Sequence, residues 1–132
     1  LSWISLIAAA IREIQDNIPD FDITLHFHNT RGVGLANVLI GLNEGIYLYE
    51  SCFGGIGGCP FAPDATGNIC SEDLVYMMNE MNIKTGIDIN QLIKIAKKAE
   101  KILDYKLPGQ VMHAGERLKK YSLEDVKTAK GN

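Results

Sequence analysis

The sequence predicts an α/β fold in which parallel strands are covered by helices. Two short apolar segments with strand composition, residues 23–27 and 46–51, flank a segment, 34–43, in which leucine and alanine recur at helical spacing. Gly45 is placed to close that helix. A strand–helix–strand order with so long a crossover is typical of parallel strands, because a tight hairpin cannot join them.

Two further helices are predicted on either side of this unit. Residues 1–17 carry isoleucine and alanine at spacings of three and four, and the pattern ends before Pro19. Residues 71–81 form the other helix, with Glu72 and Asp73 in its first turn, where the helix dipole favours acidic side chains. Both helices offer an apolar face with which to cover the strands.

The rest of the chain is predicted to begin with a helix and to end in a polar tail. Asp88, followed by a glutamine three residues later, resembles a capping box that opens a helix running to Leu103. After Pro108 the sequence becomes basic and polar, so we expect an exposed His113 and a last short helix over residues 122–127. The solvated face of the 88–103 helix is predicted to carry its lysines: Lys94, Lys97, Lys98 and Lys101.

The composition is that of an ordinary globular domain and argues against two classes of partner. Hydrophobic residues make up 46% and charged residues 22% of the 132 residues, and the formal net charge is −3. Because the basic residues are not gathered into one early patch, we expect no nucleic-acid partner. No apolar run approaches the roughly 18 residues of a membrane span, and no signal-peptide pattern is visible, so we expect no membrane partner.

Two features bear on the setting and the completeness of the chain. The three cysteines, Cys52, Cys59 and Cys70, lack CxxC spacing, which favours reduced thiols and an intracellular, cytoplasmic location. The sequence begins at Leu1 inside a helical pattern, without an initiator methionine. We therefore expect it to be the C-terminal part of a longer protein.

A His-x-His pair at the end of the first predicted strand is the strongest sign of chemistry. Side chains two residues apart on a strand point to the same face, so His26 and His28 are expected to project together, about 6–7 Å apart. Two imidazoles in that arrangement can bind one metal ion. A pair of strand residues making ordinary hydrogen bonds remains the plainer alternative.

A glycine-rich loop follows the second predicted strand. The sequence GGIGGCPFAPDATGN occupies residues 54–68, and its glycines allow left-handed turns and a close backbone approach to a ligand. Neither a GxGxxG nor a Walker pattern is present, and a tight flexible turn would explain the glycines alone. Cys59 favours function, because a thiol in a partly exposed loop can serve as an acid, a nucleophile or a redox switch.

Other polar residues in these segments admit two interpretations each. Asn68 could be a turn or cap residue, or its side-chain oxygen could ligate a hard cation. Arg31 could pair with a carboxylate or phosphate, or act as a structural strut. For Cys52 and Cys70 burial as small hydrophobic side chains is expected. Because both polar stretches follow strand ends, the site is predicted at the carboxyl edge of the parallel sheet.

These motifs resemble those of the 3-hydroxy-3-methylglutaryl-CoA (HMG-CoA) lyases. The matching stretches are LHFHNTRG at 25–32, the glycine-rich sequence at 54–68 and SEDLVYM at 71–77. The resemblance runs from about His26 to Ile89, and its glycine-rich stretch is highly specific. The tail after Leu103 matches weakly.

The resemblance implies a TIM barrel of the pyruvate carboxyltransferase-like superfamily that uses Mg²⁺ or Mn²⁺. Its reaction would be cleavage of the acyl-CoA substrate HMG-CoA into acetyl-CoA and acetoacetate. It implies that His26, His28 and Asn68 are metal ligands and that Cys59 is the catalytic cysteine of the loop. The implied substrate-loop glycines are Gly54, Gly55, Gly57 and Gly58. The residues implied to support the ligands from behind are Asn29, Arg31 and Glu72.

The resemblance assigns the whole chain, 1–132, to the C-terminal part of a TIM-barrel lyase domain. Within it, 1–17 is a helix, 22–89 the catalytic segment and 90–132 a C-terminal helical region. A complete barrel needs about 250 residues, so the chain is expected to be about half of one. The metal-binding Asp and substrate-polarising Arg of the family lie on the first barrel strand, which nothing before His26 can supply. We therefore expect the N-terminal half of the barrel, or another copy of the chain, as a partner, an oligomer as the assembled state, and no activity from the chain alone.

Two alternatives remain open. Many lyases have Asp after the second histidine, whereas Asn29 creates a pattern that also occurs in the isopropylmalate and citramalate synthases, which condense acetyl-CoA with a keto acid. Those synthases lack the GGCP loop, which favours a lyase. The other alternative is an inactive half-barrel that serves as an association module, because an unclosed barrel exposes strand edges and apolar faces.

Overall fold

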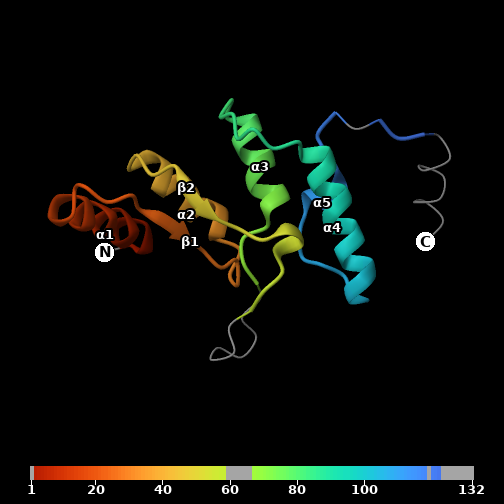
Figure 1. Ribbon diagram of the computed structural model, residues 1–132, viewed down its shortest axis with the longest axis horizontal. Coiled ribbons are helices and arrows are strands. Elements are labelled where there is room, and N and C mark those ends of the chain that lie inside the picture. Colours follow the sequence, from red (N-terminus) through yellow and green to blue (C-terminus); the bar gives the residue numbers. More distant parts are fainter. Residues whose placement is uncertain (1, 59–66, 119, 123–132) are drawn as a thin grey trace.

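The computed structural model describes residues 2–58, 67–118 and 120–122. Among the described residues, four helices of ten residues or more follow the order that the sequence predicts, and a short strand separates the first two. The elements in chain order are α1 (Trp3–Asn17), β1 (Thr24–His26), α2 (Gly34–Asn43), β2 (Leu48–Glu50), the 3-10 turn η1 (Phe53–Gly55), α3 (Ser71–Glu80), α4 (Ile89–Leu103) and α5 (Val111–Ala114). They form an elongated arrangement, with α1 at one end, the strands and α2 next to it, and α4 and α5 at the other (Figure 1).

The strands β1 and β2 are parallel and are joined through α2, as the sequence predicts. Their register pairs Thr24 with Leu48, Leu25 with Tyr49, and His26 with Glu50. Both strands are shorter than the predicted segments. At the start of the second segment the backbone turns instead, because the N–H of Ile46 donates to the carbonyl of Gly41 (2.9 Å).

A third extended segment, residues 67–70, joins the carboxyl ends of the two strands. The N–H of Asn29 donates to the carbonyl of Gly67, and the N–H of Ile69 to that of Phe27 (3.1 and 3.0 Å). On the other side, the N–H of Cys52 donates to the carbonyl of Ile69 (3.1 Å). The two polar stretches of the sequence therefore meet at one edge, as predicted.

Helix α2 lies close to this edge because glycine faces it. A Cβ on Gly34 would collide with the side chain of Ile69 and would lie 3.0 Å from the amide oxygen of Asn29. That oxygen accepts a hydrogen bond from the N–H of Gly34 (3.0 Å). Asn29 thus ties the loop after β1 to the first turn of α2.

The buried side chains form three small clusters. The first lies between α2 and α3 around Val38, Ile69 and Met78, with Phe27 and Tyr49 packed against it. The second joins α3 to α4 and α5, and the third contains Ala96, Leu107 and Met112. The boundaries of α2 and α4 agree with the predictions, and the side chain of Asp88 accepts hydrogen bonds from the N–H groups of Asn90 and Gln91, as its capping role requires.

The prediction of a polar tail after Pro108 is wrong at its start. Val111 and Met112 are buried in α5, whereas His113 is exposed, as expected, with its Nε2 3.0 Å from the carbonyl oxygen of Leu107. Of the helix expected over 122–127, Ser122 is not helical, and the remaining residues lie outside the described part of the chain.

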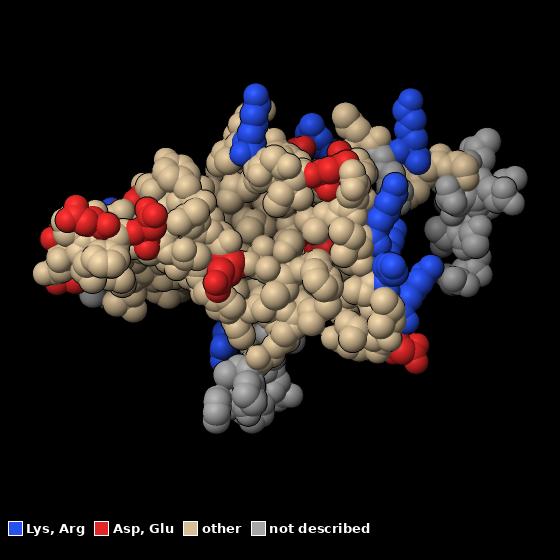
Figure 2. Space-filling view, in the orientation of Figure 1, with Lys and Arg blue, Asp and Glu red and all other residues tan. Residues whose placement is uncertain are grey.

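Charge is distributed unevenly over the surface. Acidic side chains gather around α1, and lysines line the outer face of α4, which confirms that the lysine run is solvated (Figure 2). Among the described residues, no helix has the length and apolar character needed to cross a bilayer.

Candidate active site

His26 and His28 stand side by side at the end of β1. Their ring centroids are 5.2 Å apart, and the ring planes are inclined by 57°. The side chain of His26 is 45% exposed, and His28 is half-buried. The predicted projection of both rings to one face of the strand is confirmed.

Asn68 lies on the extended segment that pairs with His28. Its backbone forms an isolated antiparallel bridge with His28. Its side-chain Nδ2 donates to the sulfur of Cys52 and to the carbonyl of Ile56 (3.0 and 3.1 Å). The buried Oδ1 has no hydrogen-bond partner among the described residues, an arrangement that normally costs free energy. The amide is therefore held with one acceptor unsatisfied.

This set of donors fits a divalent cation. Two imidazole nitrogens and one amide oxygen suit Mg²⁺, Mn²⁺ or a related ion better than a structural zinc site. Within the described residues, no group of three or more His, Cys, Asp or Glu side chains is placed to hold a metal ion, so the three proposed donors are all neutral. Three neutral ligands bind a hard cation weakly.

The glycine-rich turn is shaped by Asn68 and by the tail. Gly54, Gly55 and Gly57 have positive φ values of 63°, 72° and 126°, which confirms the predicted left-handed turns. A Cβ on Gly57 would lie 2.7 Å from Nδ2 of Asn68, so this glycine allows the turn to close around the amide. Gly58 is exposed. Cys59 lies outside the described residues.

Glu72 and Cys70 make contacts that hold the fold together. Glu72 is fully buried, and its carboxylate accepts the N–H of Gly54 (2.9 and 3.1 Å) and the thiol of Cys70 (2.5 Å). Burial, followed by this bond to Glu72, raises the pKa of the Cys70 thiol far above its usual range. Cys70 is buried as expected, whereas Cys52 is half-buried and contacts Asn68. Arg31 is exposed.

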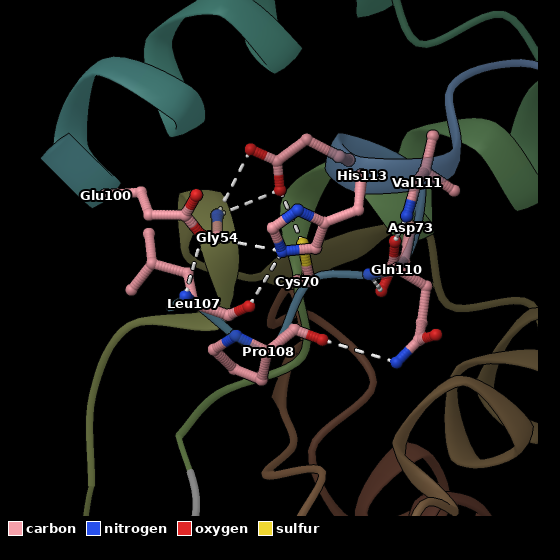
Figure 3. Close-up of polar contacts among 10 residues, drawn as sticks. Gly54, Cys70, Asp73, Glu100, Leu107, Pro108, Gln110, Val111 and His113 are labelled. Carbon is pink, nitrogen blue, oxygen red and sulfur yellow. Dashed lines mark hydrogen bonds and ion pairs between the residues drawn. The ribbon is translucent and has the colours of Figure 1, made fainter. Parts of the chain in front are cut away.

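A segment that the sequence did not indicate, residues 107–111, packs against the turn. Leu107 is 1% exposed and fills the space next to Gly54, where a Cβ would collide with it. The carboxylate of Glu100 accepts the N–H of Leu107 (2.8 Å), and Nε2 of His113 lies 3.0 Å from the Leu107 carbonyl and 3.4 Å from Glu100 (Figure 3). Asp73 accepts the N–H groups of Gln110 and Val111 (3.0 and 2.6 Å). The only sequence signal was an apolar Leu-Pro-Gly before the polar stretch.

The fold and the site together define an α/β protein with parallel strands and a candidate cation site at the ends of those strands. The chain belongs to the HMGL-like family, whose model matches residues 4–98. It is 48% identical over 109 residues to a (R)-citramalyl-CoA lyase of Chloroflexus aurantiacus, covering 83% of this chain and 34% of the relative. It is 44% identical over 92 residues to a hydroxymethylglutaryl-CoA lyase of Bacillus subtilis, covering 70% and 31%.

A comparison with solved structures points to the same family. An HMG-CoA lyase of Acinetobacter baumannii, in complex with coenzyme A and 3-methylmalate, matches with a TM-score of 0.85 at 39% identity, over 91% of this chain and 39% of that one. The predicted family and the predicted fold class, part of a TIM barrel, are confirmed. The chain spans about a third of the length of the curated relatives named above.

Proposed function

We propose that this chain carries part of the active site of a divalent-cation-dependent lyase that cleaves a carbon–carbon bond in an acyl-CoA with a tertiary 3-hydroxyl group. The first candidate substrate is HMG-CoA, with acetyl-CoA and acetoacetate as products. The observation that carries the proposal is the buried, unpartnered Oδ1 of Asn68, a residue whose backbone is bridged to His28, next to the paired rings of His26 and His28.

The relatives support the substrate class. Both curated relatives described above are lyases of CoA thioesters, and the A. baumannii structure contains coenzyme A. An acyl-CoA is therefore the substrate class we assign to the completed barrel.

His26, His28 and Asn68 would hold the cation, which supplies Lewis-acid polarisation of the substrate hydroxyl when bound. Cleavage breaks the bond between the carbinol carbon and the methylene carbon next to the thioester. The hydroxyl proton leaves to a base, the carbinol becomes a ketone, and the electron pair passes to the methylene carbon. Cys59 is proposed to give that carbon its proton, and the thiolate then recovers a proton from solvent.

The turn at residues 53–57 orients this chemistry. Glu72 holds the N–H of Gly54, Leu107 packs on the same glycine, and Gly57 lies against the Asn68 amide. The chain that leads into the loop containing Cys59 is therefore held against the Asn68 amide.

The (R)-citramalyl-CoA relative favours a second candidate substrate. Cleavage of citramalyl-CoA in the same sense would release acetyl-CoA and pyruvate. The two substrates differ by one methylene group in the acid arm, and one methylene is worth only about 1–3 kcal/mol of discrimination. The described residues do not include the full pocket that would contact this arm.

To test this proposal, the chain is combined with the N-terminal part of the barrel of a lyase relative. Product release is then measured in the presence of Mn²⁺ or Mg²⁺. Acetoacetate from HMG-CoA, or pyruvate from citramalyl-CoA, decides between the substrates. Mn²⁺ binding should be lost in His26→Ala and His28→Ala but retained in His113→Ala, a matched histidine variant outside the site. Unchanged Mn²⁺ affinity in both site variants would refute the ligand assignment.

The proposed role of Cys59 is tested by comparing serine variants of two cysteines. Cys59→Ser should lower turnover by about 10²-fold or more, because the alcohol is a far weaker acid than the thiol. Cys70→Ser should act mainly on stability. Full turnover by Cys59→Ser would mean that the loop is structural.

The same samples test the alternatives. Condensation of acetyl-CoA with a keto acid, followed by hydrolysis of the thioester and release of free CoA, would favour a synthase. The chain alone should show no turnover, since it lacks a carboxylate ligand in its described part. Metal-dependent turnover by the chain alone would contradict that expectation, and no turnover in the completed barrel would favour the association module.

A further inference from the structure

A carboxylate with no role in the proposed chemistry contacts one of the proposed ligands. Oε2 of Glu50 lies 2.9 Å from Nδ1 of His26. The contact follows from the register of the sheet, which pairs His26 with Glu50 at the ends of adjacent parallel strands. Paired residues on neighbouring strands project to the same face, so the two side chains meet beside the candidate site.

The chemistry of this contact fixes the position of a proton. A carboxylate can only accept a hydrogen bond, so Nδ1 of His26 must donate. In the neutral imidazole the lone pair then belongs to Nε2, the nitrogen left available to a cation. An unconstrained neutral imidazole prefers the opposite arrangement, with its proton on Nε2. The contact with Glu50 therefore selects the tautomer that can ligate through Nε2.

We propose that Glu50 is a positioning residue that holds His26 in the Nδ1–H tautomer and aims its Nε2 at the cation site. The proposal rests on the proposed function, in which His26 is a ligand. Histidine ligands commonly donate their second ring N–H to a carboxylate or carbonyl, which raises the basicity of the ligand. Glu50 also adds a negative charge next to a ligand set that is otherwise neutral.

An ordinary surface ion pair is the competing explanation. The side chains of Glu50 and His26 are 66% and 45% exposed, and exposed ion pairs contribute little to stability. Both explanations therefore predict that Glu50→Ala leaves the unfolding midpoint almost unchanged. The tautomer of His26 separates them, because a loose surface contact would not hold the less favoured form.

The experiment is long-range ¹H–¹⁵N correlation NMR of the ¹⁵N-histidine-labelled chain at a pH of about 9, where histidine side chains are ordinarily neutral. The three histidines are assigned with His28→Gln and His113→Gln. We expect wild-type His26 to be mainly Nδ1–H, and Glu50→Ala to return it to mainly Nε2–H. Glu50→Gln keeps an acceptor without the charge and should retain much of the Nδ1–H form. Asp16→Asn, which removes a charge from the exposed face of α1, should change nothing. A mainly Nε2–H ring in wild type, or no change in Glu50→Ala, would overturn the proposal.

Titration of the same samples with Mn²⁺ tests the proposed site separately, because paramagnetic broadening detects even weak binding. Broadening centred on His26 and His28, with affinity lowered about 10-fold in Glu50→Ala but not in Asp16→Asn, would support the positioning role. Equal Mn²⁺ affinity in wild type and Glu50→Ala would overturn that role. If the expected tautomer is found but neither histidine broadens, the cation site of the proposed function is refuted, while the contact between Glu50 and His26 stands.

Discussion

Replacement of Gly67 by alanine should destabilise the fold sharply, because backbone surrounds this glycine. A Cβ at this position would overlap the carbonyl oxygen of Gly55 and would lie 2.6 Å from the carbonyl oxygen and 3.0 Å from the nitrogen of Gly57. Comfortable contact for a carbon atom is about 3.5 Å, and backbone atoms cannot rotate away as a flexible side chain can. Overpacking typically costs 1–3 kcal/mol, so we expect about 3 kcal/mol or more for Gly67→Ala.

Gly45→Ala is the matched control, because it isolates backbone strain from steric overlap. Gly45 has φ of +79° and no atom within 4 Å of a built Cβ, so its replacement should cost only about 1–2 kcal/mol. Urea unfolding followed by circular dichroism measures both values, and the side-chain amide resonances of Asn68 report whether the site moves. Equal costs at the two glycines, or unshifted Asn68 resonances in a folded Gly67→Ala protein, would refute this account of the turn.

Three further outcomes follow from contacts outside the proposed ligands. The backbone N–H of Gln91, and after it the Gln91 side chain, donate hydrogen bonds to Asp88 and hold the pKa of this carboxyl below its usual value. The ionised Asp88 therefore stabilises the fold fully above its unfolded pKa of about 4, and this stabilisation is lost as the pH falls through the lowered folded pKa. The difference in urea stability between wild type and Asp88→Ala should therefore be smaller at pH 3 than at pH 7, and a constant difference would contradict this. Leu107→Ala should cost about 2–5 kcal/mol in urea unfolding, because it leaves a cavity against Gly54, and a cost below about 1 kcal/mol would mean that the segment packs loosely. The buried Cys70 thiol, with its raised pKa, should react with iodoacetamide only after unfolding, and peptide mapping that finds it modified in the native protein would contradict its burial.

The parts of the fold that sequence reasoning predicted are those that depend on local signals. The ends of α2 follow from the leucine spacing and from Gly45, and the start of α4 follows from the cap at Asp88. The pairing of the two histidine rings needs only the alternation of a strand. Each of these features is determined by residues within about one turn or one strand of each other.

The parts that were missed depend on contacts between distant segments. Asp73 accepts the N–H of Val111, 38 residues later, and no local pattern indicates that contact. Glu72 was expected in a first helical turn, which is correct, but its bond to Gly54, 18 residues earlier, depends on how η1 packs on α3. Glu50 has no distinctive local pattern at all, because its meeting with His26 requires the strand register.

The supports of the proposed ligands also differ in strength, and this difference predicts which ligand the chain holds most firmly. Asn68 is fixed by its backbone bridge to His28 and by both bonds of its amide group, all formed by folding. His26 lies at a strand end, nearly half exposed, with one side-chain contact to an exposed carboxylate. The ordering of Asn68 therefore costs nothing further when a cation binds, whereas the ring of His26 must be restrained at that moment. On this argument the amide oxygen is the fixed point of the site, and the restraint that Glu50 places on His26 is the part that a single substitution can weaken without disturbing the fold.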